Sequence, residues 1–284
     1  MYSKLKAYTI LTKHRLSLLV VFSAVVSYIT VSENPDWKIA LYLSIGGFLI
    51  TAASNGFNQI IEKHLDALME RTKERPLPLG ILSNTEALIF SLSITAIGLF
   101  FLYLCSMLSA IIGFVSLLLY VLAYTPLKQK TPWSVFVGAF PGALPTLIGA
   151  VTGQAYQGSI EFLSWLLFVI QFIWQFPHFW TLAWFNAEDY KRAGFYLLPN
   201  RKKDNSAVFL IFMYSCFLAG SALLPYLFHY IGWMSALVIA IASLTLIIQA
   251  YIFLKAPSDT MAKKLFKVCI IYLPVIQLTI MTRI

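Results

Sequence analysis

The stretch KHRLSLLVVFSAVVSYITVS, residues 13–32, begins with basic side chains and continues as an uncharged, mostly apolar run. A run of this length comes close to the roughly 20 residues that an α-helix needs to cross the hydrocarbon of a bilayer. The stretch therefore predicts a membrane-spanning helix over 16–32. Lys13 and Arg15 would then lie at one membrane boundary.

The same pattern recurs along the whole chain of 284 residues, which is 59% hydrophobic and has a mean hydropathy of +0.77. Such a series of long apolar runs is typical of an all-α polytopic membrane protein. We expect a single membrane domain over 1–284 with nine spans around a central cavity, and a tight hairpin between the third and fourth. The predicted spans are 16–32, 39–61, 86–106, 108–124, 134–152, 160–185, 207–228, 234–254 and 265–282.

The placement of Lys and Arg tests this number of spans. If the N-terminus is cytoplasmic, nineteen of the 21 basic residues fall on the cytoplasmic side, and Lys38 and Arg283 are the exceptions. Cytoplasmic loops of membrane proteins carry such an excess. The alternation predicts that the N-terminus lies inside, that the C-terminus lies outside and that the cavity opens near the cytoplasmic side. The net charge of +9 is then an orientation signal, and no nucleic-acid partner is expected.

Charged residues are concentrated in NQIIEKHLDALMERTKERPLP, residues 58–78. Asn58, Glu62 and Asp66 follow one another at intervals of four residues, so a helix places them along one face. Their oxygens suit a hard cation such as Mg²⁺, and the bases that follow suit phosphate. A solvated helix end, with the acids paired to nearby bases, explains this spacing equally well.

A second cluster of acids followed by bases lies in WQFPHFWTLAWFNAEDYKRAGFYLLP, residues 174–199. The predicted topology places it on the same membrane face as the first cluster. The two clusters can then face one another across one cavity. This arrangement favours a diphosphate site over two unrelated helix ends.

Together with YTPLKQKTPWSVFVGAFPGALPTLIG, residues 124–149, the two clusters resemble the UbiA superfamily of intramembrane prenyltransferases, most closely its heme O synthase branch. The superfamily's first motif, NDxxDxxxD, is matched at Asn58, Glu62 and Asp66. Gln59 stands where an acid is usual, and Glu62 replaces an aspartate. The second motif corresponds to the region from Asn186 to Tyr190.

The resemblance implies Mg²⁺ as cofactor and the following residue roles. The catalytic residues would be Asn58, Glu62, Asp66 and Asp189. The metal ligands would be Asn58, Glu62, Asp66, Asn186, Glu188 and Asp189. The diphosphate contacts would be Arg71, Lys73, Arg75, Lys128, Lys191 and Arg192. For Lys128, a simple loop anchor remains an equal alternative.

The heme O synthase branch implies transfer of a farnesyl group from farnesyl diphosphate to a vinyl group of heme b, with addition of water, to give heme O and diphosphate. Heme b is then a substrate, with His178, Trp174 and Trp180 as expected contacts. For His178 a structural role beside Pro177 is the alternative. The other histidines, His14, His64 and His229, and the three isolated cysteines carry no predicted chemistry.

The branch also implies a multi-pass protein of the bacterial inner membrane, with its active-site face cytoplasmic. It suggests supply of heme-copper oxidases, with a heme A synthase or oxidase assembly factors as partners. Two other functions remain open from the sequence. One is an aromatic prenyltransferase of quinone or chlorophyll synthesis, and the other is a transporter, which is expected to place acids near the bilayer midplane.

Overall fold

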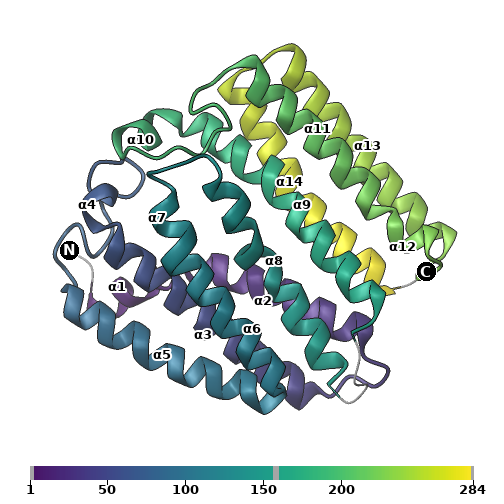
Figure 1. The fold of residues 1–284 in the computed structure, drawn as a ribbon, viewed down its shortest axis with the longest axis horizontal. Helices are drawn as coiled ribbons and strands as arrows, with labels where there is room; N and C mark the ends of the chain where they lie inside the picture. The colour runs from purple at the N-terminus through teal and green to yellow at the C-terminus, as the bar shows by residue number, and fades with distance from the viewer. Residues whose placement is uncertain (1–2, 156–159, 283–284) are drawn as a thin grey trace.

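Helices form all the regular structure of the residues that the computed structural model describes, 3–155 and 160–282 (Figure 1). Within these residues, nine helical segments are long and apolar enough to cross a membrane, which confirms the predicted number of spans. The orientation of the termini relative to the membrane stays a prediction.

The first four spans are α2, α3, α5 and a composite helix. Their bounds are His14–Val31, Trp37–Ile61, Asn84–Cys105, and Met107–Leu118 (α6) continued by a π-helix, η1 (Leu119–Tyr124), and by α7 (Thr125–Leu127). Ser106 alone separates α5 from α6, and its hydroxyl accepts a hydrogen bond from the Ser109 N–H at 3.0 Å. This side-chain cap starts α6 immediately, so the predicted tight hairpin is confirmed.

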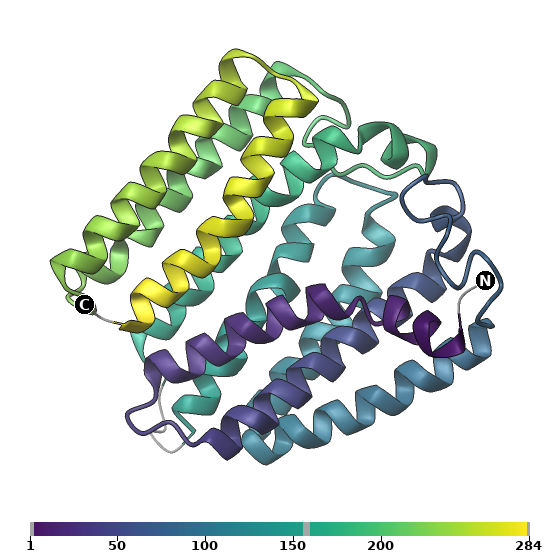
Figure 2. The ribbon, with the colours of Figure 1, turned by 180° about the vertical axis from the view of Figure 1, so that it is seen from behind.

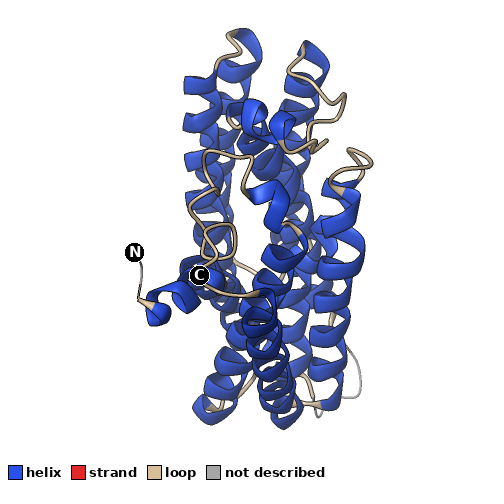
Figure 3. Ribbon diagram, turned by 90° about the vertical axis from the view of Figure 1, so that its left-hand side faces the viewer, coloured by secondary structure: helices blue, strands red, loops and turns tan. Residues whose placement is uncertain are grey.

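The remaining spans are α8, α9, α11 with α12, α13 and α14. Their bounds are Ser134–Gly153, Phe162–Phe185, Asn205–Ala222 with Leu224–Leu227, Trp233–Lys255 and Asp259–Thr282. Three short helices lie at helix ends: α1 (Lys4–Leu11), α4 (Lys63–Asp66) and α10 (Ala187–Arg192). In the side view of Figure 3 the long helices run side by side, and α1 projects beside them near the N-terminus.

The long helices pack in two groups that meet at α8 (Figures 1 and 2). One buried cluster joins α9, α11, α13 and α14, and another joins α2, α3, α5 and α6. Helix α8 contributes side chains to both clusters and is buried along most of its length. It therefore acts as the central helix of the molecule.

Small residues allow α2 to approach α8 closely. A Cβ atom on Gly149 would lie 1.9 Å from the Ala24 carbonyl oxygen of α2, and one on Gly153 would lie 2.6 Å from the Ser32 hydroxyl. The Ser27 hydroxyl also donates to the Thr146 carbonyl at 2.7 Å. Backbone contact at this distance is possible only with glycine, which explains why α8 is rich in small residues.

Helix α8 continues through Pro141 and Pro145. Because a proline has no N–H, Pro145 leaves the Pro141 carbonyl without its helical donor. The Ser116 hydroxyl of α6 donates to that oxygen at 3.4 Å. A neighbouring helix thus satisfies a carbonyl that lipid could not.

Candidate active site

The end of α3 and the short helix α4 hold the three residues of the predicted motif in register. The Glu62 N–H donates to the Asn58 carbonyl at 2.9 Å, and the Asp66 N–H donates to the Glu62 carbonyl at 2.8 Å. The backbone therefore keeps its helical spacing even though α3 formally ends at Ile61. All three side chains, which we call the ladder, are buried, and those of Glu62 and Asp66 are only 4% and 1% exposed.

Each of the two buried carboxylates is paired with a base, Asp66 within its own segment and Glu62 with a residue of another segment. The Arg75 guanidinium donates to both Asp66 carboxylate oxygens, at 2.8 and 2.7 Å, and Lys128 forms an ion pair with Glu62. A buried carboxylate is costly unless it is paired in this way. An exposed acid paired with a nearby base, as a solvated helix end would have, is found at Glu70, which pairs with Lys73 at the surface.

The π-helix η1 and α7 position Lys128 beside this ladder. Thr125 donates its hydroxyl to the Tyr120 carbonyl at 2.8 Å and accepts a hydrogen bond from the Asn58 amide at 3.1 Å. The Lys128 ammonium lies 5.0 Å from the ring centres of Tyr124 and Phe195. Burial lowers the pKa of Lys128, and the neighbouring Glu62 opposes that shift. A π-helical segment is a frequent feature of functional sites.

Helix α10 brings the second cluster against the loop that follows α4. Asp189 accepts hydrogen bonds from the N–H groups of Glu70 at 3.3 Å and Arg71 at 3.2 Å, and it pairs with Arg192. Arg71 also donates to the Tyr190 hydroxyl at 3.1 Å. The structure thus joins two segments that lie more than a hundred residues apart in the sequence.

The pKa values of Asp189 and Tyr190, the two α10 residues that contact the loop, both differ from their ordinary values. Partial burial raises the pKa of Asp189, but the Arg71 N–H and the Arg192 guanidinium outweigh it and hold the pKa below its usual value. Burial raises the pKa of the Tyr190 hydroxyl. Asp189 is therefore ionised at neutral pH and serves as an acceptor for the loop.

Other residues of the predicted set are not brought to the ladder. Asn186 donates its amide to the Leu182 carbonyl of its own helix at 2.8 Å, and Glu188, Lys191 and Arg192 are exposed. Within the described ranges, no three His, Cys, Asp or Glu side chains converge in a group able to hold a metal. The predicted ligands are instead divided between the ladder and α10.

The donor set of the ladder nevertheless fits a hard divalent cation. Asn58 uses its amide nitrogen on Thr125, which leaves its oxygen available, and Glu62 and Asp66 add two buried carboxylates. Oxygen donors of this kind suit Mg²⁺, which completes its shell with phosphate and water. Lys128 and Arg75 occupy these carboxylates in the structure described here.

The predicted heme contacts lie on two faces of α9. The His178 ring stacks between Trp174 and Phe266 of α14, with ring centres 4.3 and 4.8 Å away. Its Nδ1 atom is buried and has no hydrogen-bond partner among the described residues. Trp180 packs against Tyr214 of α11 instead, so it does not share a surface with His178.

Sequence reasoning missed one basic residue of the site, Lys13. It lies between α1 and α2 with a left-handed backbone (φ 45°), which is uncommon for a residue with a side chain. Burial, together with the positive charges of Arg75 and Lys128, lowers the pKa of Lys13 to about 7. The sequence gives no reason to single out Lys13, because Lys13, His14 and Arg15 together are typical of a basic segment at a membrane boundary.

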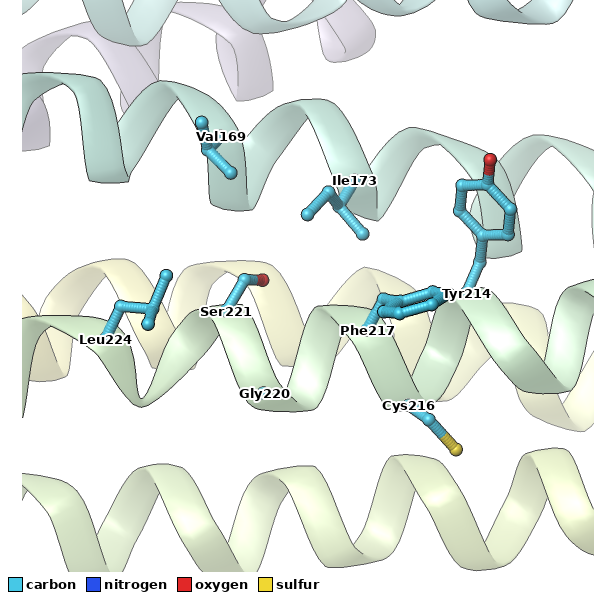
Figure 4. A pocket seen from close by; sticks show the side chains of 8 residues that line it. All are labelled: Val169, Ile173, Tyr214, Cys216, Phe217, Gly220, Ser221 and Leu224. Atoms are coloured by element: carbon cyan, nitrogen blue, oxygen red, sulfur yellow. The ribbon is translucent and has the colours of Figure 1, made fainter. Parts of the chain in front are cut away.

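An apolar hollow of the surface lies elsewhere, between α9 and α11 (Figure 4). Val169 and Ile173 face Tyr214, Phe217 and Leu224 across it. None of the residues that line it is charged. It is therefore not suited to bind a diphosphate, and the ladder remains the candidate site.

Known proteins resemble this chain over nearly its full length. A protoheme IX farnesyltransferase of Christiangramia forsetii is 42% identical over 273 residues, which cover 94% of this chain and 90% of that protein. Another from Cytophaga hutchinsonii is 40% identical, with 98% and 97% covered. The likeness therefore includes both charged clusters.

Solved structures share the fold. A structure described as digeranylgeranylglyceryl phosphate synthase superposes with a TM-score of 0.81 at 21% identity, covering 99% of this chain and 98% of that one. A UbiA homolog from Archaeoglobus fulgidus, bound to GPP and Mg²⁺, gives 0.72 at 14% identity, covering 96% and 99%. The family model described as "UbiA prenyltransferase family" matches residues 18–271. The chain thus belongs to the UbiA prenyltransferase family and is a membrane-embedded prenyltransferase.

Proposed function

We propose that this chain transfers the farnesyl group of farnesyl diphosphate to a vinyl group of heme b, with addition of water, to give heme O and diphosphate. The observation that carries the proposal is the pair of buried ion pairs, Glu62 with Lys128 and Asp66 with Arg75. They concentrate both acids and bases at one place, as a site for a metal-bound diphosphate requires. The names of the relatives supply the two substrates.

The reaction begins with departure of the diphosphate. The bond between farnesyl C1 and the diphosphate oxygen breaks, and the electron pair leaves with the oxygen. Arg75 and Lys128 lie beside the ladder and are placed to bind the leaving oxygens, and charge stabilisation at that point lowers the barrier. Bound Mg²⁺, held by Asn58, Glu62 and Asp66, would neutralise further charge on the diphosphate.

The farnesyl cation is then captured by the heme. Farnesyl C1 forms a carbon–carbon bond to the outer vinyl carbon, which leaves a cation on the inner vinyl carbon. Water adds there and releases one proton, so the product carries a hydroxyethylfarnesyl group. Trp174 and His178 are the aromatic groups that we assign to the heme, since they share one face of α9.

The distribution of basic residues supports a cytoplasmic active-site face in a bacterial inner membrane. Arg71, Lys73 and Lys128 belong to the segments that the predicted topology places inside. The lipid bilayer is then the surrounding partner. Neither the fold nor the names of the relatives supports a heme A synthase or an oxidase assembly factor as a partner, and the proposal does not include them.

Mass spectrometry of the heme tests the proposal. Purified protein is incubated with heme b, farnesyl diphosphate and Mg²⁺, and we expect heme b to be converted to heme O. Excess EDTA should stop the conversion, and added Mg²⁺ should restore it. Unchanged heme b, together with prenylation of a quinone precursor such as 4-hydroxybenzoate, would instead place the chain with the aromatic prenyltransferases.

A further inference from the structure

The junction between α1 and α2 is built into the candidate site. The Gln59 amide, one residue after Asn58, donates to the Leu11 carbonyl at the end of α1 at 2.7 Å. Gln59 and Leu11 are both fully buried. The contact therefore fixes the end of α1 against the same turn of α3 that carries the ladder.

The backbone of the junction is held on both sides of Lys13. The Lys13 N–H donates to the Ile10 carbonyl at 3.1 Å, and the Lys13 carbonyl accepts from the N–H groups of Leu16 at 2.9 Å and Ser17 at 3.1 Å. The Ser17 hydroxyl also donates to the Thr12 carbonyl at 2.9 Å. These bonds hold the left-handed conformation of Lys13, which turns the chain from α1 into α2.

The charges around the Lys13 ammonium are not balanced. It interacts electrostatically with two bases, Arg75 and Lys128, and with the two acids that these bases already neutralise. Among the described residues, no ion pair is formed by Lys13 itself. When Lys13 is protonated, three cations face two carboxylates, and this excess positive charge on a half-buried residue favours a bound anion, which would in turn favour the protonated lysine.

We propose that Lys13 is a direct ligand of the diphosphate and that Gln59 is the residue that positions it. This inference rests on the proposed prenyl diphosphate substrate. It gives a distinct role to Gln59, which replaces the usual acid of the motif, because the Gln59 amide donates to a carbonyl and a carboxylate cannot. The N-terminal segment then forms one wall of the diphosphate site.

Binding of inorganic diphosphate in the presence of Mg²⁺, measured by calorimetry, tests the role of Lys13. Loss of one charge-assisted contact should raise the Kd of Lys13→Met about 10- to 100-fold, and Lys13→Arg should retain most of the affinity. Farnesyl diphosphate should show the same loss, because the contact is to the diphosphate and not to the prenyl chain. Heme b affinity should not change.

Arg15→Met is the matched control, since Arg15 is an exposed base two residues away. Its Kd for inorganic diphosphate should equal that of the unmodified protein. If Lys13→Met binds inorganic diphosphate as tightly as Arg15→Met does, Lys13 is not a ligand.

A double-mutant cycle tests the role of Gln59. Gln59→Leu should weaken diphosphate binding in the native background but add little in the Lys13→Met background, because it acts through Lys13. A purely structural Gln59 predicts independent losses of affinity in the two backgrounds, and that result would overturn the positioning role. If Gln59→Leu does not fold, Gln59→Asn, which retains a shorter amide, replaces it in the same cycle.

The outcomes separate this inference from the proposed function. Heme conversion by the unmodified protein, together with unaltered binding by Lys13→Met, rejects the inference alone. Lys13-dependent binding of inorganic diphosphate without any heme conversion rejects only the heme substrate.

Discussion

At the scale of single residues, Asp66 has the most enclosed carboxylate of the ladder and holds Arg75 through both oxygens. Its removal has two separable effects, loss of a metal ligand and loss of the partner of a mostly buried guanidinium. Asp66→Ala combines both effects, since Arg75 would be left unpaired. Asp66→Asn keeps the shape and one acceptor, so it isolates the charge.

We predict that Asp66→Asn lowers farnesyl transfer at least about 100-fold, since the charge that retains metal and diphosphate is lost. Heme O formation by the purified variant measures the effect, and thermal unfolding in detergent checks the fold. Glu70→Gln, which alters an exposed acid of the same segment, should leave the rate unchanged. Rates near the native value for Asp66→Asn in excess Mg²⁺ would exclude its role as a metal ligand.

His178 allows a second residue-scale prediction. Its ring faces are covered by Trp174 and Phe266, so only the ring edge is available to a ligand. If that edge contacts heme, His178→Ala should weaken heme b binding and leave diphosphate binding intact. Heme titration by absorbance and calorimetry with diphosphate measure the two affinities, and His64→Ala, at an exposed position, is the control. Equal weakening of both ligands would indicate a structural histidine.

At the scale of elements, the docking of α10 on the loop after α4 depends on one ionised carboxylate. The pKa of Asp189 in the folded chain lies below its ordinary value of 3.8. The ionised carboxylate should therefore stabilise the docking fully when the pH is above the ordinary pKa of aspartate. This stabilisation should be lost as the pH falls through the lower pKa of Asp189 in the folded chain. At neutral pH the contact is at full strength.

We predict that Asp189→Asn increases hydrogen exchange at the Glu70 and Arg71 amides by about tenfold or more at neutral pH, because two charge-assisted bonds become weaker. In the native protein the same increase should occur only in acid, below the ordinary pKa of aspartate. Exchange measured by mass spectrometry across the loop gives both results. Glu188→Gln is the control, and an unaltered exchange rate in Asp189→Asn would show that α10 does not hold the loop.

The packing of α2 on α8 gives a further test at this scale. Gly149→Ala would place a Cβ atom 1.9 Å from the Ala24 carbonyl oxygen, so the helices must separate. We expect a loss of about 1–3 kcal/mol in the free energy of unfolding, or more, as overpacking usually costs. Gly220→Ala on α11 is the matched control, since nothing lies within 4 Å of its added Cβ. In detergent, Gly149→Ala should have a lower Tm than Gly220→Ala. Equal Tm values would contradict the close approach of α2 and α8.

The elements also show what the sequence could predict. Hydropathy predicted all nine spans because each is a local property of some twenty residues. The spacing of Asn58, Glu62 and Asp66 placed them on one helix, and the structure keeps that spacing. The ion pairs of these acids could not be predicted in the same way. Lys128 pairs with Glu62 from another helix, and such a contact has no local sequence pattern.

Lys13 shows the same limit more sharply. A basic residue before an apolar run has an ordinary explanation in membrane topology. Nothing in the sequence indicates that this lysine adopts a left-handed backbone. Its neighbourhood depends on how α1 folds back against α3, through a side-chain amide at Gln59. Only the tertiary arrangement separates this lysine from Arg15, which the same sequence pattern places beside it.

At the scale of the whole molecule, the charged clusters lie at one end of the bundle, where α4, α7 and α10 meet (Figure 1). Most Lys and Arg residues belong to connections that alternate with connections almost free of basic residues. If the positive-inside rule applies, the end that carries the ladder faces the cytoplasm. The sidedness of the site can therefore be measured without any substrate.

We predict that single cysteines replacing Lys73 or Lys202 react with a membrane-impermeant maleimide only when the cytoplasmic side is exposed. Cysteines replacing Asn34 or His229 should react in intact cells. All four positions are exposed, and a background without the three native cysteines removes competing thiols. Reaction of Lys73→Cys and Lys202→Cys on opposite sides would contradict the predicted topology, since an even number of spans must separate them. Reaction of both from outside would keep the fold and reverse its orientation, so that the diphosphate would have to bind from the outer face.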